Sequence, residues 1–467
     1  MPYPPLGIYT HSNGRTNKVI AQFKGARTRT PKKLMKRARS SSSNDSAPLP
    51  GKENRLTTGA LTFELLATDG CARASLVTLP HGDVSTPVFM PVGTYGAMKG
   101  VPSPELATLG PQIILANTYH VGNRPGASFL KKEGGLHKFM KWTGNMLTDS
   151  GGFQMVSLAK LLSLSEEGVE FESPVDGSKM LLTPELSMEI QNAIGADIMM
   201  VLDDVVESTC PDLVRMKEAT ERTIRWLDRC ILAHKNPETQ NLFAIVQGGL
   251  DSELREWSLG QTIARNTPGF AIGGLSGGEG KDAFWRVVFQ CTSALPSLKP
   301  RYVMGVGYPL DIVVCVALGA DMFDCVYPTR TARFGTALIE SGQMRLSHSG
   351  FKSDVRVIDP NCVCRTCTSK ISRAYLHPLA GRDPVAARMI TEHNIVFMMS
   401  FMKRVQTAIK EQRFEVFVAQ FLQKMYPNTR PPTWVRNALV EGANMQTIDT
   451  LFDWTIPVSE SDHPHTR

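Results

Sequence analysis

Three aspartates stand where short apolar runs end, a position better suited to chemistry than to folding. Asp149 follows Asn145-Met-Leu-Thr, Asp203 follows Met199-Met-Val-Leu, and Asp324 follows Ala320-Asp-Met-Phe. An acid at the end of an apolar strand is costly to desolvate unless something retains it there. Two such acids can divide the roles of nucleophile and general acid–base. The alternative for each is a plain turn or a helix cap.

Glycine-rich turns follow several of the same apolar runs. They are Ser150-Gly-Gly152, Gln247-Gly-Gly249 and Gly273-Gly-Leu-Ser-Gly-Gly278. Glycine allows a ligand to approach the backbone closely, and a glutamine amide suits the polar edge of a planar base. Taken alone, each of these turns is as well explained by chain reversal.

Aromatic, thioether and cationic groups complete the set of candidate site residues. Phe153 and Met304 offer flat or polarisable surfaces for a heterocycle, and Arg330 and Arg333 suit phosphate groups. Asp204 directly follows Asp203, so we expect one of the pair to face the site and the other to cap the next helix.

A separate cluster has the composition of a metal centre. Cys362-x-Cys364-x2-Cys367 supplies three thiolates within six residues, and a histidine downstream would complete a closed tetrahedral zinc site. Spacing alone does not decide between His377 and His393 as the fourth ligand. Buried free thiols are the alternative.

The elements that must position these residues are short apolar runs that alternate with longer helical segments. The seven runs are 111–119, 145–149, 196–203, 241–247, 269–274, 301–305 and 320–324. From Asp149 onward, successive run ends lie 19 to 54 residues apart, which is enough for one helix in each connection. This pattern predicts a parallel sheet, either doubly wound or closed. Only a closed barrel brings the ends of at least five strands to one rim, so we predict a (β/α)8 TIM barrel. Two carboxylates at a barrel mouth then favour cleavage of an N- or O-glycosidic bond.

The segments on either side of this pattern differ from it. Residues 1–57 are rich in Ser, Pro, Lys and Arg, and we predict a disordered basic tail there, with 58–455 forming the barrel domain and 456–467 a flexible C-terminus. A zinc-binding subdomain is expected at about 335–425. Within it, 334–351 has the pattern of short strands and 395–422 that of one long helical segment.

Charge and cysteine content limit the possible partners and compartments. The net charge is +7, but residues 1–50 carry +9, so the remainder carries −2 and any polyanion must meet a local patch. Nine cysteines, an odd number, without a signal-peptide core indicate a reducing compartment. No run approaches the apolar length of a transmembrane helix.

Taken in order, these motifs resemble those of tRNA-guanine transglycosylases, and within them the eukaryotic queuine-inserting branch, from about Leu61 to Asp453. The motifs that carry the resemblance are Asp149-Ser-Gly-Gly-Phe-Gln, Val246-Gln-Gly-Gly, Gly273-Gly-Leu-Ser-Gly-Gly-Glu279, Met304-Gly-Val-Gly307, Phe323-Asp-Cys-Val-Tyr-Pro-Thr-Arg330 and the Cys ladder followed by His393. The resemblance implies exchange of guanine for queuine at the wobble position of tRNAs with GUN anticodons.

The resemblance also implies a role for each matching residue. Asp324 would be the nucleophile and Asp149 the proton donor and acceptor. The residues implied to bind the base are Asp149, Ser150, Gly151, Gly152, Phe153, Asp203, Gln247, Gly274 and Met304. Those implied to contact RNA are Gly305, Val306, Gly307, Tyr308, Pro309, Leu310, Asp311, Thr329, Arg330, Thr331, Ala332 and Arg333. One structural zinc ion per chain would be held by Cys362, Cys364, Cys367 and His393.

Further expectations concern partners and location. The resemblance implies tRNA and queuine as substrates, and a heterodimer with a non-catalytic accessory homologue. It implies a cytoplasmic protein, with peripheral attachment to the mitochondrial outer membrane as an alternative. A non-enzymatic tRNA-binding partner and a hydrolytic glycosidase are the competing functions, and the intact pair Asp149 and Asp324 speaks against the first of them.

Overall fold

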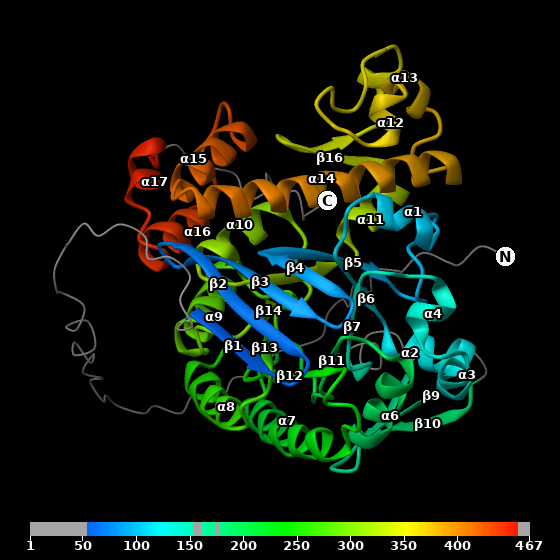
Figure 1. Ribbon diagram of the computed structural model, residues 1–467. Coiled ribbons are helices and arrows are strands. Elements are labelled where there is room, and N and C mark those ends of the chain that lie inside the picture. The colour runs from blue at the N-terminus through cyan, green and yellow to red at the C-terminus, as the bar shows by residue number, and fades with distance from the viewer. Residues whose placement is uncertain (1–53, 153–159, 173–176, 456–467) are drawn as a thin grey trace, which may run out of the picture. The chain divides into compact units, whose positions relative to one another are not determined.

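Eight parallel strands close into a barrel in the computed structural model, which describes residues 54–152, 160–172 and 177–455 (Figure 1). Each strand pairs with its neighbours in chain order, and the last pairs with the first through Phe323 and Phe89. The predicted TIM barrel is therefore confirmed. Its strands are β5 (Val88–Gly93), β6 (Ile113–Ala116), β7 (Asn145–Thr148), β11 (Ile198–Met200), β12 (Asn241–Val246), β13 (Gly269–Ile272), β14 (Arg301–Val303) and β15 (Met322–Cys325).

Seven of these strands coincide with the apolar runs seen in the sequence. The eighth, β5, was not among them, because Pro91 lies inside it and proline ordinarily argues against a strand interior. In the structure, β5 pairs with β15 up to Pro91 and with β6 from Val92 onward.

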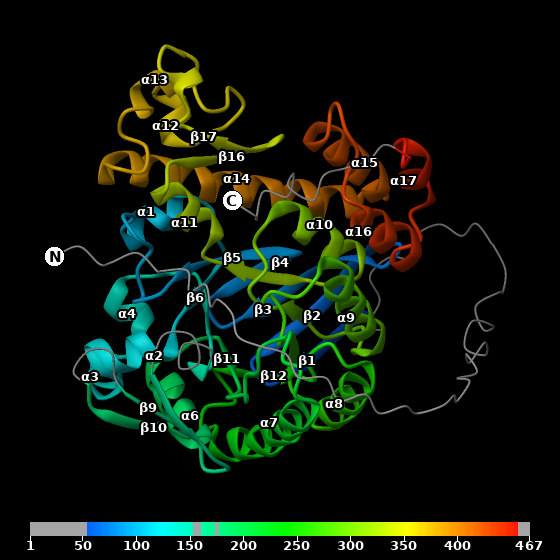
Figure 2. The same cartoon turned by 180° about the vertical axis from the view of Figure 1, so that it is seen from behind.

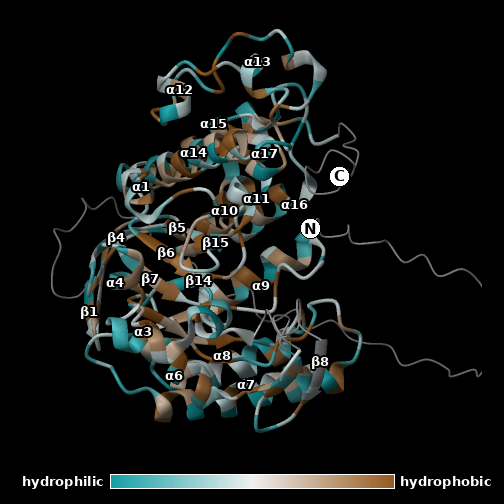
Figure 3. Ribbon diagram, turned by 90° about the vertical axis from the view of Figure 1, so that its right-hand side faces the viewer, coloured by the Kyte–Doolittle hydropathy of each residue, from teal (hydrophilic) through white to brown (hydrophobic). Residues whose placement is uncertain are grey.

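Helices surround the barrel, and Figure 2 shows α14 crossing one side of it while α7 and α8 line the opposite side. Apolar residues concentrate on the barrel strands, whereas α6 and α7 carry both kinds of residue (Figure 3). The helices are α1 (Ser103–Thr108), α2 (Thr118–Val121), α3 (Ala127–Glu133), α4 (Leu136–Met140), α6 (Pro184–Ile194), α7 (Leu213–Ala233), α8 (Ser252–Ala264), α9 (Lys281–Ala294), α10 (Pro309–Ala317), α11 (Tyr327–Arg333), α12 (Arg365–Thr368), α13 (Arg373–Leu376), α14 (Pro384–Lys410), α15 (Phe414–Met425), α16 (Thr433–Arg436) and α17 (Gln446–Leu451).

Three small sheets are added to the barrel. A four-stranded meander precedes it, a three-stranded sheet follows β7, and a hairpin follows α11. The strands are β1 (Arg55–Thr58), β2 (Leu61–Asp69), β3 (Ala72–Leu79), β4 (Gly82–Thr86), β8 (Lys160–Leu164), β9 (Val169–Glu172), β10 (Lys179–Leu182), β16 (Thr336–Ile339) and β17 (Gly342–Arg345). The hairpin confirms the short strands expected in 334–351.

The meander closes the N-terminal end of the barrel. The backbone N–H of His81, in the β3–β4 turn, lies 3.2 Å from Asn145 Oδ1 and 3.2 Å from Asp197 Oδ1, at the starts of β7 and β11. The predicted site residues lie at the opposite end of the barrel.

One buried ion pair ties the meander to the barrel. Arg73 in β3 donates from Nε to Asp321 Oδ1 over 2.9 Å and from Nη2 to Asp321 Oδ2, and both side chains are almost fully buried. The Arg301 backbone N–H also donates to Asp321 Oδ2, over 2.8 Å. The Asp321 carboxylate therefore meets a cation at the foot of β15.

The helical segment expected at 395–422 is two helices rather than one. The chain breaks at Glu411–Arg413 between α14 and α15, and Gln412 has a φ of 55°. A residue with positive φ commonly ends a helix. The apolar pattern continues on both sides of Gln412, so the pattern alone could not show that the helix ends there. The fold allows α15 to pack back on α14, with Phe401 5.5 Å from Phe421 between ring centroids.

The predicted N-terminal tail and C-terminal segment fall largely outside the described residues, although β1 begins at Arg55. Among the described residues, no helix is both long and apolar enough to cross a membrane.

Replacement of Arg73 by Met should destabilise the protein strongly, because Asp321 would remain buried without a cation. Loss of one partner from a buried pair costs about 3–5 kcal/mol, and we expect a decrease of that size in the free energy of unfolding, measured in urea. The control is Arg265→Met, which removes the pair with exposed Asp228 and should cost at most about 1 kcal/mol. Equal effects of the two variants would contradict this account.

Candidate active site

The C-terminal ends of the barrel strands bring the three predicted acids to one rim. Asp149 follows β7, Asp203 lies three residues beyond β11, and Asp324 is in β15. Ser150 Oγ, next to Asp149, lies 3.3 Å from Asp203 Oδ1, and the charge of Asp324 contributes to the raised pKa of Asp149. The three carboxyl groups therefore share one mouth.

Asp324 is held by two neutral donors. Its Oδ1 accepts hydrogen bonds from the Tyr302 hydroxyl over 2.5 Å and from the Gly305 backbone N–H over 2.8 Å. Burial raises the pKa of Asp324, and these two hydrogen bonds oppose the rise because they favour the ionised form. Among the described residues, no hydrogen bond reaches its Oδ2, so this arrangement fixes the carboxyl group and leaves one oxygen available as a candidate nucleophile.

Asp149 has the electrostatics of a proton carrier. Burial is the largest of the causes that raise its pKa to about 7, although Thr118 N–H, the Asn117 amide and Gly151 N–H all donate to the carboxylate. A group with a pKa near the operating pH can both give and take a proton. The hydrogen bonds also fix the carboxyl in the mouth.

Asp203 and Gln247 form one hydrogen-bonded unit. Gln247 Nε2 donates to Asp203 Oδ2 over 2.7 Å, and burial raises the pKa of Asp203 to about 6. A Cβ on Gly274, where φ is +66°, would lie 2.4 Å from Gln247 Oε1, so glycine is required for this approach. The unit presents carboxylate, amide and bare backbone to the mouth.

Asp204 is not a helix cap, contrary to the expectation for this acid pair. Its carboxylate pairs with Arg215 and Arg222 on α7, while Asp212 accepts a hydrogen bond from the Arg215 N–H and caps that helix. Neighbouring residues of an extended segment point in opposite directions, so Asp204 turns toward the helices while Asp203 faces the mouth.

The glycine-rich turn after β13 is tied to the β11–α7 connection by an acid. Glu279 accepts hydrogen bonds from Ser276 N–H over 2.6 Å, from Gly277 N–H over 2.9 Å and from Ser208 Oγ over 2.7 Å. A Cβ on Gly277 would lie 2.9 Å from Ser208 Oγ. The wall of the mouth at this point is therefore thin and fixed.

Several residues of the site were missed by the sequence reasoning. Arg255, fully buried on α8, donates to the carbonyls of Val246, Gly249 and Gly273 and so holds two glycine turns together. Arg255 and Tyr302 lie in segments whose sequence pattern is that of ordinary core packing. Only the closure of the barrel brings them near the acids. Asn117 ends the run that follows Pro111, and its position at a strand end was the available signal.

The predicted stacking residues are only partly visible. Met304 is half-buried and follows β14, at the same rim as Asp324. Phe153 lies outside the described residues.

Most of the predicted RNA-contact residues are buried, and the exposed ones lie at two points of the rim. Gly305 and Arg330 are exposed, whereas Thr331 and Arg333 are half-buried. The remaining eight, Val306, Gly307, Tyr308, Pro309, Leu310, Asp311, Thr329 and Ala332, are buried. Asp311 pairs with Lys281 over 2.6 Å. Direct side-chain contact with a ligand is therefore available mainly to Arg330 and Arg333.

The cysteine cluster assembles with His393 as its fourth member. The ligand atoms of Cys362, Cys364, Cys367 and His393 all lie within 4.8 Å of one another, a spacing that could hold a metal ion. His393 Nε2 lies 2.9 Å from the Leu338 carbonyl, which leaves Nδ1 facing the sulfurs at 3.4 and 3.5 Å. His377 instead directs Nδ1 to the Leu346 carbonyl.

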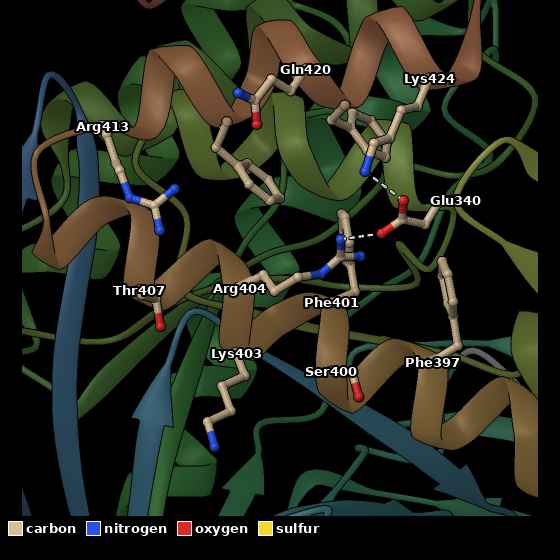
Figure 4. A pocket seen from close by; sticks show the side chains of 12 residues that line it. Glu340, Phe397, Ser400, Phe401, Lys403, Arg404, Thr407, Arg413, Gln420 and Lys424 are labelled. Carbon is tan, nitrogen blue, oxygen red and sulfur yellow. Dashed lines mark hydrogen bonds and ion pairs between the residues drawn. The ribbon is translucent and has the colours of Figure 1, made fainter. Parts of the chain in front are cut away.

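A cleft of about 470 Å³ between α14 and α15 is a separate feature (Figure 4). It is lined by phenylalanines and cations, and Glu340 bridges Arg404 and Lys424 across it. Glu340 is the one carboxylate among the residues that line it, and although burial acts to raise its pKa, Lys424 and Arg404 lower it. The barrel mouth, with its three carboxyl groups of raised pKa, is therefore the stronger candidate for an active site.

Comparison with known proteins agrees with this geometry. The sequence model described as queuine tRNA-ribosyltransferase matches residues 69–427. The chain is 51% identical over 402 residues to the queuine tRNA-ribosyltransferase catalytic subunit of Schizosaccharomyces pombe, covering 84% of this chain and 98% of that protein. The catalytic subunit of Caenorhabditis elegans is 50% identical over 395 residues, with coverages of 81% and 98%.

A bacterial relative is nearly as similar. The queuine tRNA-ribosyltransferase of Deinococcus radiodurans is 44% identical over 386 residues, which cover 82% of this chain and 96% of that protein. The chain therefore belongs to the queuine tRNA-ribosyltransferase family.

Proposed function

We propose that this chain replaces guanine with queuine at the wobble position of tRNAs with GUN anticodons, through a covalent enzyme–tRNA intermediate. The observation that carries the proposal is the pairing, on one rim, of an anchored carboxylate with a second carboxyl whose pKa is about 7. Family membership supplies the substrate class.

In the first half of the reaction, Asp324 attacks C1′ of the target guanosine. The C1′–N9 bond breaks, an ester bond forms between C1′ and the Asp324 carboxylate, and Asp149 gives its proton to the departing guanine. Tyr302 and Gly305 donate to one oxygen of Asp324 and so direct the other toward C1′. The protonated Asp149 keeps guanine from leaving as an anion.

In the second half, the incoming base reverses these steps. Asp149, now ionised, takes a proton from queuine, whose ring nitrogen attacks C1′ and releases the Asp324 carboxylate. Two displacements at one carbon retain its configuration. No separate energy source is needed, because one N-glycosidic bond replaces another.

The Asp203–Gln247 unit selects the base. An ionised Asp203 accepts hydrogen bonds from N–H groups on one edge of a guanine-like ring, while Gln247 and the Gly274 backbone meet the other polar edge. Ser150, Gly151 and Gly152 follow Asp149 at the same rim, and Ser150 Oγ donates to Asp203. The resemblance assigns the faces of the ring to Met304 and Phe153, and the second of these lies outside the described residues. Gly277 adds no side chain to the pocket wall, and we expect this lack of bulk to accommodate the additional ring of queuine.

Zinc is the metal that best fits the cysteine cluster. Three thiolates and one imidazole fill a tetrahedral shell and leave no open position, so the ion is structural and takes no part in the reaction. It would hold the 362–367 loop against α14 and thereby support α11, which packs on the same helix.

The partner and the location rest on the resemblance alone. We propose a heterodimer with a non-catalytic homologue and a cytoplasmic location, with peripheral attachment to the mitochondrial outer membrane as the alternative. The presence of both reactive acids on one rim favours an enzyme over a non-catalytic tRNA-binding chain.

Replacement of Asp324 by Asn should abolish covalent attachment of tRNA, because an amide cannot displace guanine from C1′. Denaturing gel electrophoresis of the protein with labelled tRNA measures the attachment. Normal exchange of labelled guanine by Asp324→Asn would overturn the assignment.

Tyr302→Phe provides a graded counterpart, because it removes one donor and keeps the nucleophile. Since the lost hydrogen bond favours ionised Asp324, we expect the acid limb of the pH–rate profile to move to higher pH. The rate should fall about 10- to 100-fold, as expected for a hydrogen bond to a charged group.

The two half-reactions should depend on pH in opposite ways, because Asp149 must be protonated in the first and ionised in the second. With a pKa of about 7, formation of the covalent intermediate should slow above that pH, and its resolution by queuine should slow below it. Single-turnover measurements of each step test this. Asp149→Asn should slow both by about 10²- to 10⁴-fold, and an unchanged pH dependence in that variant would contradict the role.

Removal of a metal ligand should release zinc and loosen the subdomain. We expect Cys364→Ser to lower the zinc content well below one ion per chain and to lower the unfolding temperature. His377→Asn is the matched control, since His377 bonds a backbone carbonyl and should retain the ion. Elemental analysis and thermal unfolding distinguish the two variants.

A further inference from the structure

One aromatic side chain at the rim has no structural partner. Phe334 directly follows α11 and is 71% exposed, which makes it the most exposed aromatic residue in the described part of the chain. Within that part, its ring stacks on no other ring and lies under no cation. By contrast, the exposed pair Phe129 and Phe139 pack edge to face, and Tyr95 packs on His120.

Helical spacing places Phe334 on the same face as two arginines. Arg333 and Phe334 follow Arg330 by three and four positions, the spacings at which side chains of a helix are neighbours. The backbone at Phe334, with φ −93° and ψ 12°, still follows the helical turn. Thr329 and Ala332, on the other side of α11, are buried. The helix therefore presents two guanidinium groups and one bare ring to solvent.

The cations beside Phe334 are uncompensated. None of Arg330, Arg333 and Lys99 forms an ion pair with a described residue. Their positive charges also lower the pKa values of neighbouring basic groups. Burial and then the charges of Arg333 and Arg330 lower the pKa of Lys99, and Arg330 contributes to the lowered pKa of Arg333. Three like charges held together without acids favour an anionic partner.

The distance from the reaction centre fits a neighbouring nucleotide. Asp324 precedes α11 by three residues, and the seven residues of α11 extend about 10 Å at 1.5 Å per residue. Stacked nucleotides along one strand are spaced about 3.4 Å apart, so the length of α11 corresponds to about three stacked nucleotides. A wobble base that enters the mouth leaves its neighbours unpaired and near this ring.

We propose that Phe334 is a stacking platform for an unpaired base that flanks the exchanged nucleotide, with Arg330, Arg333 and Lys99 holding the adjacent phosphates. The inference rests on the proposed function and adds a base contact to it. Aromatic rings bind unpaired bases by stacking, and cations alone would bind the backbone without positioning a base. A protein partner is less well matched, because an apolar docking surface would exclude three unpaired cations.

The test measures binding of an anticodon stem-loop RNA by fluorescence anisotropy, together with guanine exchange. Phe334→Ala should weaken RNA binding about 5- to 100-fold, as for loss of one stacked base, and leave the KM for free guanine unchanged. Phe334→Trp should retain the affinity. Phe139→Ala, an exposed aromatic on α4, is the control and should bind as the wild type does.

Abasic RNAs identify the base that stacks. Removal of one base within three nucleotides of the target should weaken binding to the wild-type protein and have no further effect on Phe334→Ala. Equal losses in both proteins, or unchanged RNA affinity in Phe334→Ala, would overturn the proposal, as would a change in oligomeric mass on light scattering. If the wild-type protein binds RNA but exchanges no guanine, the proposed function is wrong. The effect of Phe334→Ala on RNA binding can still be measured in that case, so the two proposals fail separately.

Discussion

The structure depends on how buried carboxylates are compensated at the two ends of one barrel. Ionised acids withdrawn from water need either a cation or a set of dipoles. At the N-terminal end, Asp321 meets Arg73, and Asp197 lies 2.7 Å from His81 Nδ1 and 3.2 Å from His137 Nε2. Although burial acts to raise it, the pKa of Asp197 is lowered because the two histidines prevail. Both acids face basic side chains of the meander, and these pairs lock the meander to the strands.

At the C-terminal end, the described hydrogen-bond donors to the same residue type are neutral. Asp149, Asp203 and Asp324 accept hydrogen bonds from amides, hydroxyls and backbone N–H groups, and burial raises the pKa of all three. Asp321, directly before β15, and Asp324, within that strand, show the contrast over three residues. The acid paired with Arg73 stabilises the fold, whereas the raised pKa of Asp324 is typical of residues at functional sites.

Sequence patterns predicted the parts of this arrangement that are encoded locally. Seven apolar runs, three of which end in Asp149, Asp203 and Asp324, indicated seven strands, and the spacing of Cys362, Cys364 and Cys367 indicated the metal cluster. Features that depend on packing were not visible. Pro91 hid the eighth strand, and the turn at Gln412 divided a continuous apolar pattern. Tyr302 and Arg255 lie in segments that look like ordinary core until the barrel closes around them.

The same distinction between paired and unpaired charge explains how a body with a net charge of −2 can attract RNA. Along α7 and α8 the arginines are neutralised in place, with Arg229 on Glu185 and Arg265 on Asp228, so that face presents little net field. At the rim, Arg330 and Arg333 have no described acid beside them. Because surface fields decay over about 8–10 Å at physiological salt, a polyanion senses this local excess rather than the total charge. On the function proposed above, the mouth that holds Asp149 and Asp324 would also be the place that attracts the backbone of an RNA.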